Sequence, residues 1–228
     1  MPPVITRTED GFDTLISQQY NQTYHSIHGA AVEANHVFFR GAGVEARCQD
    51  RLPTRILEVG FGTGLNFLLT AQSAMASGTP IHYTGLEDDV LPAELFASLN
   101  HAAKIPAGPG LSTWRRTLPS PTPPGAYTHT FSPDCVLELV VGNAAIAPIP
   151  GPCYHAIYLD AFSPEANPEL WTPAFLARLF ALTCPGGRLA TYSAKGIVRR
   201  RLAACGYDVE RKPGPPGKRE MLVGRKPL

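Results

Sequence analysis

The chain has 228 residues, of which 44% are hydrophobic and 17% are charged. This composition excludes a disordered chain, and no apolar run approaches the ~18 residues that indicate a transmembrane helix. The net charge of +1 hides an asymmetry, because residues 186–228 carry eleven Lys and Arg against three acidic residues. Such a segment suits a polyanionic partner, although solvated helix ends and an edge strand also collect basic residues.

The elements expected from the sequence begin with an N-terminal extension, residues 1–50, that reads as mostly helical after Asn21 and is dense in aromatic residues and histidines. Strands and helices then alternate, with strands at 55–59, 81–87, 135–142, 154–160 and 188–193 and helices at 64–76, 91–103, 168–183 and 195–205. Residues 105–133 carry seven prolines and little periodicity, so we expect a Pro-rich insertion loop.

This alternation predicts an α/β fold in a single domain over residues 1–228, with a mostly parallel sheet and helices on both of its faces. Residues 207–211 and 219–225 flank a Pro-Gly turn and predict a C-terminal antiparallel hairpin. Five scattered cysteines never show Cys-x-x-Cys spacing, so we expect reduced thiols in the cytoplasm rather than disulfides. The histidines lack metal-binding spacing, and no metal is expected.

The segment that follows the first strand has three alternating glycines. Glu58 lies near the end of the strand, and Gly60, Gly62 and Gly64 strip the turn of side chains, so that a ligand can lie against the backbone. A dinucleotide fingerprint would need a glycine at position 65, which is leucine. The pattern instead resembles motif I of class I S-adenosylmethionine (SAM) methyltransferases. Its candidate cofactor-binding residues are Glu58, Gly60, Phe61, Gly62, Thr63, Gly64 and Asn66.

Polar residues also end the second and third strands. Glu87 is placed to accept hydrogen bonds from two ribose hydroxyls, with Asp88 and Asp89 as competitors or as caps of the next helix. Asn143, followed by Ala144, is placed to bind the adenine amine, or else forms an ordinary turn.

The fourth strand ends in Asp160, at the sheet edge where open α/β folds bind ligands. A carboxylate there can orient an amine and accept its proton, or it can stiffen the cofactor loop. Phe162 is grouped with Asp160 as a catalytic candidate, lining an aromatic pocket for a base. Five basic residues form a candidate phosphate-binding face, the alternative being a solvated surface: Lys195, Arg199, Arg200, Lys218 and Arg219.

The chain resembles the methyltransferase module of MnmC-type tRNA-modifying enzymes, from about residue 20 to residue 224. The resemblance rests on Gly-Phe-Gly-Thr-Gly-Leu-Asn at 60–66, Asp-Ala-Phe-Ser-Pro-Glu-Ala-Asn-Pro at 160–168 and Lys-Arg-Glu-Met at 218–221. The family usually has Gly-Asp-Ala where this chain has Gly142-Asn143-Ala144.

The resemblance implies a class I, Rossmann-like fold with a seven-stranded sheet, and SAM as the cofactor. It implies N-methylation of 5-aminomethyl-2-thiouridine, a wobble uridine of tRNA, to the methylaminomethyl product. Full-length enzymes of this type carry an FAD-dependent oxidase domain, whereas this sequence shows no second nucleotide fingerprint and resembles the stand-alone form. A separate oxidase is therefore a possible partner. The alternatives are a SAM-type transferase acting on a small-molecule amine and a non-catalytic module that binds SAM or RNA.

Overall fold

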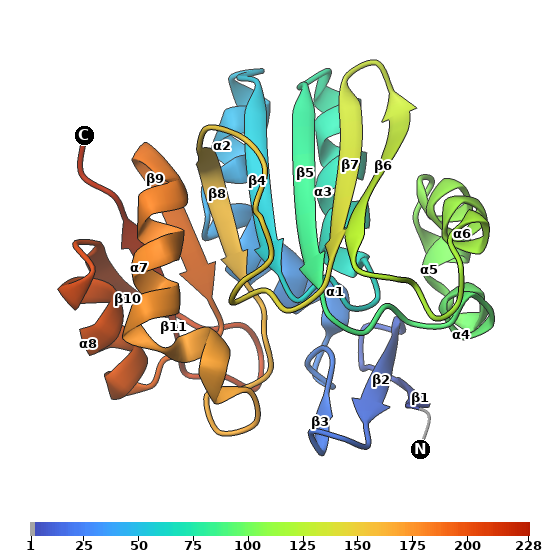
Figure 1. Cartoon of the computed structure of the whole chain (residues 1–228), viewed down its shortest axis with the longest axis horizontal. Helices are drawn as coiled ribbons and strands as arrows, with labels where there is room; N and C mark the ends of the chain where they lie inside the picture. Colours follow the sequence, from blue (N-terminus) through green and yellow to red (C-terminus); the bar gives the residue numbers. More distant parts are fainter. Residues whose placement is uncertain (1–2) are drawn as a thin grey trace.

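The computed structural model describes residues 3–228. The strands of its main sheet are β4 (Thr54–Val59), β5 (Ile81–Glu87), β6 (Gly125–Ser132), β7 (Cys135–Val141), β8 (Tyr154–Leu159), β9 (Thr183–Thr191), β10 (Asp208–Pro213) and β11 (Glu220–Arg225). They lie in the order β10-β11-β9-β8-β4-β5-β7-β6 through the middle of the molecule (Figure 1). Strands β7, β5, β4, β8 and β9 pair in parallel, and the C-terminal hairpin pairs antiparallel with β9, which confirms the predicted architecture.

Helices cover both faces of this sheet. One face carries α1 (Ala30–Glu33), the π-helix η1 (Ala34–Arg40), α2 (Val44–Gln49) and α3 (Leu65–Ser77), and the other carries the 3₁₀ helix η2 (Pro168–Trp171), α7 (Pro173–Leu182) and α8 (Gly196–Ala204). Each face has its own cluster of buried apolar side chains. Because both faces are covered, all residues but one are buried in β4 and likewise in β8.

Strand β4 lies where the direction of the connections reverses. From β4 the chain adds β5 and then β7 on one side, and later returns to place β8 on the other side. Such a reversal opens a crevice at the carboxyl ends of the central strands, where open α/β sheets bind ligands. The residues that follow β4 and β8 therefore meet at one edge of the sheet.

The N-terminal segment differs from the sequence prediction of a mostly helical extension. It forms a three-stranded antiparallel sheet of β1 (Val4–Arg7), β2 (Asp13–Ser17) and β3 (Gln22–Thr23), below the carboxyl edge of the main sheet (Figure 1). Helical structure begins only at Ala30. The Asp10 carboxylate accepts hydrogen bonds there from the backbone N–H groups of Ala31 (2.9 Å) and Val32 (3.1 Å). Asp10 therefore caps the start of this helix although it is remote from it in the sequence.

The expectation of one long loop over residues 105–133 is wrong. This segment contains α6 (Gly108–Thr117) and β6, which pairs antiparallel with β7 and makes the sheet eight-stranded rather than seven-stranded. Pro109 lies in the first turn of α6, where proline is tolerated, so it does not exclude a helix. Two short helices, α4 (Ala93–Ser98) and α5 (His101–Lys104), pack beside α6 in place of the expected single helix over 91–103.

The cysteines also differ in part from the expectation of reduced thiols. Cys153 and Cys184 form a disulfide, with Cα atoms 5.1 Å apart, whereas Cys48, Cys135 and Cys205 are free. The parallel pairing of β8 and β9 brings the two residues together although they are 31 positions apart, which sequence spacing does not reveal. Within residues 3–228, no helix is both long and apolar enough to cross a membrane.

Candidate active site

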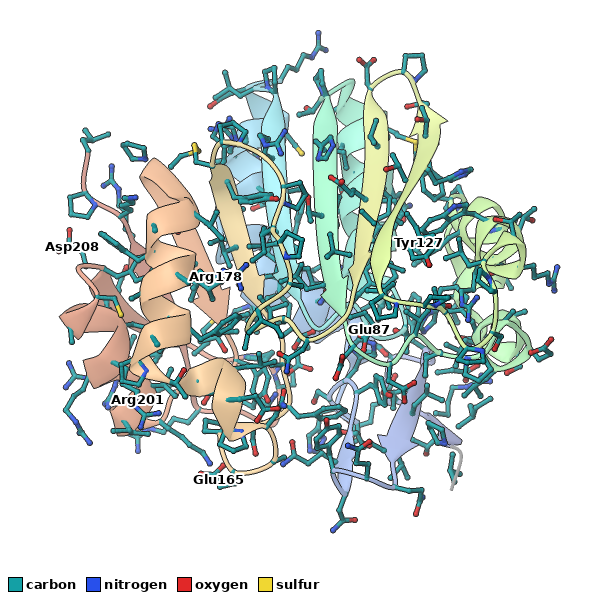
Figure 2. The ribbon with its side chains drawn as sticks, viewed as in Figure 1. Glu87, Tyr127, Glu165, Arg178, Arg201 and Asp208 are labelled. Atoms are coloured by element: carbon teal, nitrogen blue, oxygen red, sulfur yellow. A yellow bond between two sulfur atoms is a disulfide. The ribbon has the colours of Figure 1, made fainter. Side chains whose placement is uncertain are left out.

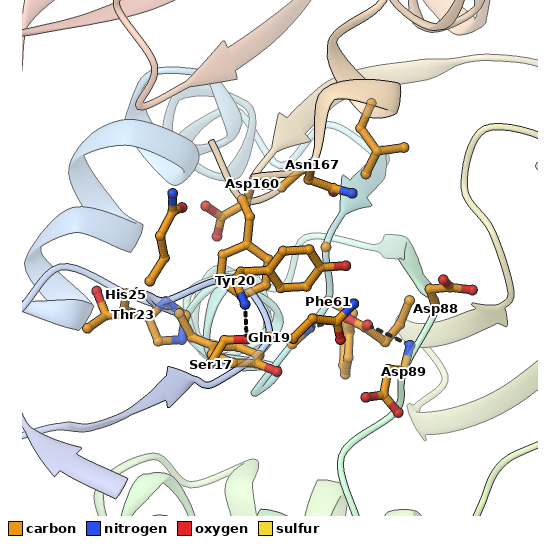
Figure 3. Close-up of a pocket in the computed structure, with 18 of the residues that line it drawn as sticks. Ser17, Gln19, Tyr20, Thr23, His25, Phe61, Asp88, Asp89, Asp160 and Asn167 are labelled. Carbon is orange, nitrogen blue, oxygen red and sulfur yellow. Dashed lines mark hydrogen bonds between the residues drawn. The ribbon is translucent and has the colours of Figure 1, made fainter. Parts of the chain in front are cut away.

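A cavity of about 570 Å³ lies at the carboxyl edge of the sheet. Its floor comes from residues that follow β4, β5, β7 and β8, and its cover comes from residues 17–27 around β3 (Figure 3). This volume falls within the range typical of small-molecule and cofactor sites. The cavity is therefore placed where the strand order predicts a ligand.

The glycine-rich turn between β4 and α3 forms one wall. Gly60 has φ +90°, and a Cβ atom there would lie 2.7 Å from the carbonyl oxygen of Asp160. Gly62 has φ +50°, and a Cβ atom there would lie 3.0 Å from Cδ1 of Tyr24. Both positions combine a left-handed backbone with close neighbours, so only glycine fits without displacement.

Two acidic side chains lie side by side behind this turn. Asn66 Nδ2 donates to Glu58 Oε1 (2.7 Å) and to Asp160 Oδ2 (2.8 Å), and the Tyr83 hydroxyl donates to Glu58 Oε2 (2.8 Å). Burial raises the pKa of Glu58 to about 8 and raises the pKa of Asp160 well above its ordinary value. The carbonyl oxygen Oδ1 of Asn66 is buried and has no hydrogen-bond partner within the described part of the chain.

Glu87 lines the cavity at the end of β5. Its Oε2 accepts from the backbone N–H of Gly62 (2.7 Å), and its Oε1 accepts from that of Asp89 (3.0 Å). Burial raises the pKa of Glu87, while these two backbone hydrogen bonds oppose that rise. Asp88 and Asp89 also line the cavity, so the structure brings all three predicted acids to it.

Asn143 and Ala144 line the cavity as predicted, beyond the end of β7. Asn143 Oδ1 accepts from the backbone N–H of Ala145 (2.9 Å), which is the ordinary Asn turn weighed as an alternative. A carbonyl oxygen has two lone pairs, so this turn leaves room for one further donor.

Aromatic rings gather around Phe162 at the mouth of the cavity. Tyr20 stacks on Phe162 with ring centroids 4.5 Å apart, and Tyr24 meets the same ring edge-on at 5.2 Å. Trp171 is instead fully buried, and its Nε1 donates to the carbonyl oxygen of Phe162 (2.8 Å). Trp171 therefore does not line the cavity but supports, through this hydrogen bond, the loop after β8 that contains Phe162.

The predicted basic residues do not act as one group. Lys218 lines the cavity and donates to Glu33, whereas Lys195 forms an ion pair with Glu165 at the surface. Arg199 and Arg200 lie exposed on α8, and Arg219 lies exposed in the hairpin. Figure 2 shows Glu165 and Arg201 in the same lower region of the molecule. Four of the five residues thus belong to the outer surface.

Sequence reasoning missed the part played by the N-terminal cover. Gln22 exchanges two hydrogen bonds with Ser163, and His25 Nε2 lies 2.7 Å from Thr63 Oγ1 in the glycine-rich turn. Burial lowers the pKa of His25 to about 3, so the ring is neutral. The density of aromatic residues and histidines near positions 20–39 was the available signal. It did not reveal which turn these residues contact.

Comparison with known proteins bears on this arrangement. A family model described as S-adenosyl-L-methionine-dependent methyltransferase matches residues 114–227. The bifunctional protein MnmC of Aromatoleum aromaticum, named for tRNA 5-methylaminomethyl-2-thiouridine biosynthesis, is 39% identical over 228 residues. The protein of the same name from Burkholderia mallei is 35% identical over 237 residues.

In both comparisons the match covers 98% of this chain and 35% of the relative, so the chain spans about a third of the length of these proteins. Among solved structures, MnmC2 from Aquifex aeolicus superposes with a TM-score of 0.82 at 24% identity, covering 99% of this chain and 72% of that one. That superposition shows the same fold. The family model matches half of the chain, and the chain therefore belongs to the family of S-adenosyl-L-methionine-dependent methyltransferases.

Proposed function

We propose that residues 1–228 form a single SAM-dependent N-methyltransferase domain that acts on the aminomethyl group of a 5-aminomethyl-2-thiouridine at the wobble position of tRNA. The observation that carries this proposal is the similarity to MnmC proteins along 98% of the chain. The cavity at the carboxyl edge supports it, because a bare backbone turn, the Asp160 carboxyl group and a cluster of aromatic rings all line it.

The residues present fit SAM. A backbone free of side chains at Gly60 and Gly62 gives room for the methionine part. Glu87 would accept from the ribose hydroxyls, and Asn143 with Ala144 would border the adenine. Glu58 and Asn66 do not line the cavity and support it from behind, because Asn66 Nδ2 donates to both Glu58 and Asp160.

When bound, SAM supplies a methyl group on a positively charged sulfur. The residues of the chain hold an amine in line with that methyl group and accept one proton from it. Positioning of this kind can supply roughly 7–11 kcal/mol of the barrier reduction. Asp160 lies at the cavity wall, where its carboxylate can orient the amine and accept the proton. Phe162 and Tyr20 would stack on the base that carries the amine.

The basic surface of α8 supports tRNA as the partner, because Arg199 and Arg200 are both exposed on this helix. Such a substrate implies a cytoplasmic location. An FAD-dependent oxidase, in the same protein or in another, would act first where the uridine carries a carboxymethylaminomethyl group.

The proposal can be tested by incubating the protein with methyl-labelled SAM and hypomodified tRNA, followed by mass spectrometry of the nucleosides. We expect label in 5-methylaminomethyl-2-thiouridine. Asp160→Asn should lose most of the transfer while still binding SAM. Label only in small amines would favour the alternative transferase, and SAM binding without transfer to any acceptor would favour a non-catalytic module.

A further inference from the structure

Lys218 lies at the acceptor end of the cavity, the part around Asp160, because it sits over the Tyr192 ring, whose hydroxyl donates to the carbonyl oxygen of Ala161 (2.9 Å), the residue after Asp160. It is the one lysine or arginine among the described residues that line the cavity. Its Nζ donates to Oε1 of Glu33 and lies 4.1 Å from the centroid of the Tyr192 ring. Glu33 is held in turn, because its Oε2 accepts from the backbone N–H of Ser26 (2.8 Å) and its side chain is 6% exposed. The ammonium group is therefore fixed at the wall rather than free in solvent.

This end of the cavity is otherwise acidic. Burial, together with the negative charges of Glu33 and Glu58, raises the pKa of Asp160, and the Asn66 amide and the Lys218 ammonium oppose that rise. The ionisable groups that face Asp160 come from five segments: Glu33 of α1, Glu58 of β4, Tyr83 of β5, Tyr192 after β9 and Lys218 of the β10–β11 turn. Among these groups Lys218 is the only cation.

The chemistry of an amine acceptor conflicts with such an acidic pocket. An alkylamine resembles the lysine side chain, whose pKa is about 10.4, so nearly all of it carries a proton at neutral pH. A protonated amine has no lone pair for attack, and each neighbouring carboxyl group that is ionised would hold the proton more firmly. A fixed positive charge at the same place has the opposite effect.

We propose that Lys218, fixed by Glu33, sets the protonation state of the acceptor end by disfavouring a proton both on Asp160 and on the substrate nitrogen. The amine then enters in its neutral form and meets an ionised carboxylate. Its lone pair forms the N–C bond as the C–S bond breaks, with the bonding electrons leaving on sulfur, and the methylammonium product passes one proton to Asp160. Lys218 is thus a positioning residue, separate from the outer basic residues with which the sequence grouped it. The statement about the amine rests on the proposed function, whereas the statement about Asp160 does not.

The first test needs no substrate. The Asp160 carboxyl carbon, labelled with ¹³C and assigned by comparison with Asp160→Asn, is titrated by NMR in the wild type and in three variants. Lys218→Met should move the Asp160 titration to higher pH by roughly one unit, a tenfold change in proton affinity. Glu33→Gln, which leaves the lysine without its counter-charge, should move it to lower pH. Lys218→Arg should stay close to the wild type.

The second test measures single-turnover methyl transfer to hypomodified tRNA between pH 5.5 and 9.5. Lys218→Met should be at least tenfold slower near pH 6.5, and the loss should shrink towards pH 9.5 as Asp160 ionises in both proteins, whereas Glu33→Gln should shift the acidic limb the other way. An equal loss at every pH, or Asp160 titrations that coincide in all four proteins, would overturn the proposal. If the wild type transfers no methyl group to tRNA, the proposed function fails, and the NMR titration still decides the role of Lys218.

Discussion

Tyr20 lies stacked on Phe162, with their ring centroids 4.5 Å apart and their planes 28° apart. Tyr20 belongs to the N-terminal cover and Phe162 to the loop after β8, so the contact joins two distant parts of the sequence in the lining of the cavity. Both rings are therefore placed to stack on a base held in the cavity.

Replacing Tyr20 with alanine should weaken the binding of tRNA and leave the binding of SAM unchanged. Base–aromatic stacking contributes about 1–3 kcal/mol per base, so KM for tRNA should rise roughly 5- to 150-fold. Tyr127→Ala is a matched control, because Tyr127 on β6 does not line the cavity, and its hydroxyl donates to the carbonyl oxygen of Pro123. Steady-state kinetics with tRNA as the varied substrate would check this, and equal KM values in both variants would assign Tyr20 to the cover alone.

Gly62→Ala should reduce the affinity for SAM at least tenfold. The new Cβ atom would lie 3.0 Å from Tyr24 Cδ1 and would take space along the cofactor wall. Gly78→Ala provides the same backbone strain without the contact, because Gly78 has φ +68° and a Cβ atom there would meet no other atom within 4 Å. Both variants should lose about 1 kcal/mol of stability, so calorimetric SAM binding separates the two effects. Similar affinities in both would remove the cofactor from this turn.

Glu87→Ala should weaken SAM binding by about 1.5–3 kcal/mol, the usual contribution of a hydrogen bond to a charged group. Asp88→Ala is the informative comparison, since Asp88 also lines the cavity and was a competitor for the ribose in the sequence. We expect Asp88→Ala to bind SAM as the wild type does. A loss in Asp88→Ala with none in Glu87→Ala would transfer the ribose contact to Asp88.

Glu58 should make the free energy of unfolding depend on pH. Its pKa is about 8 in the fold against an ordinary 4.5, so its stabilising contribution is complete below pH 4.5 and is lost as the pH rises through 8. Between pH 4.5 and pH 8, the free energy of unfolding of Glu58→Gln should therefore rise relative to that of the wild type. The total rise should be a few kcal/mol, on the order expected from the size of the pKa shift. Urea unfolding without SAM at a series of pH values would measure this.

Charge reversal at Arg199 or at Arg200 should weaken tRNA binding and spare SAM. Each contact with a phosphate that is lost should reduce the slope of log affinity against log salt by about one. Arg116→Glu makes the same change in charge on α6, which lies at the opposite end of the molecule (Figure 1), and should have little effect. Filter binding at several salt concentrations would check this. Equal losses in all three variants would indicate a nonspecific effect of net charge.

The central part of the fold was predictable because its signals are local. The run at 55–59, the alternating glycines and the acidic ends of β4, β5 and β8 follow directly from strand, turn and helix chemistry. The N-terminal strands were missed because they are short and their periodicity is too brief to distinguish from a helix or loop. Strand β6 was missed because the prolines around it dominate the composition of the segment.

The site was predictable to a similar depth. The residues after β4, β5, β7 and β8 converge because parallel strands end at one edge, and nine of the predicted positions line the cavity: Gly60, Phe61, Gly62, Glu87, Asn143, Ala144, Asp160, Phe162 and Lys218. The contacts of His25 with Thr63 and of Lys218 with Glu33 span 38 and 185 positions. No local pattern encodes contacts of that range, and they change the role expected of Lys218.

The cavity wall draws on residues from position 17 in the N-terminal cover to position 218 in the C-terminal hairpin. A ligand held there contacts both ends of the chain at once, so a partly folded domain would have no complete pocket to offer. When the ligand is bound, the small N-terminal sheet and the hairpin should therefore unfold in one cooperative thermal transition. The midpoint temperature of that transition should rise as the ligand concentration increases.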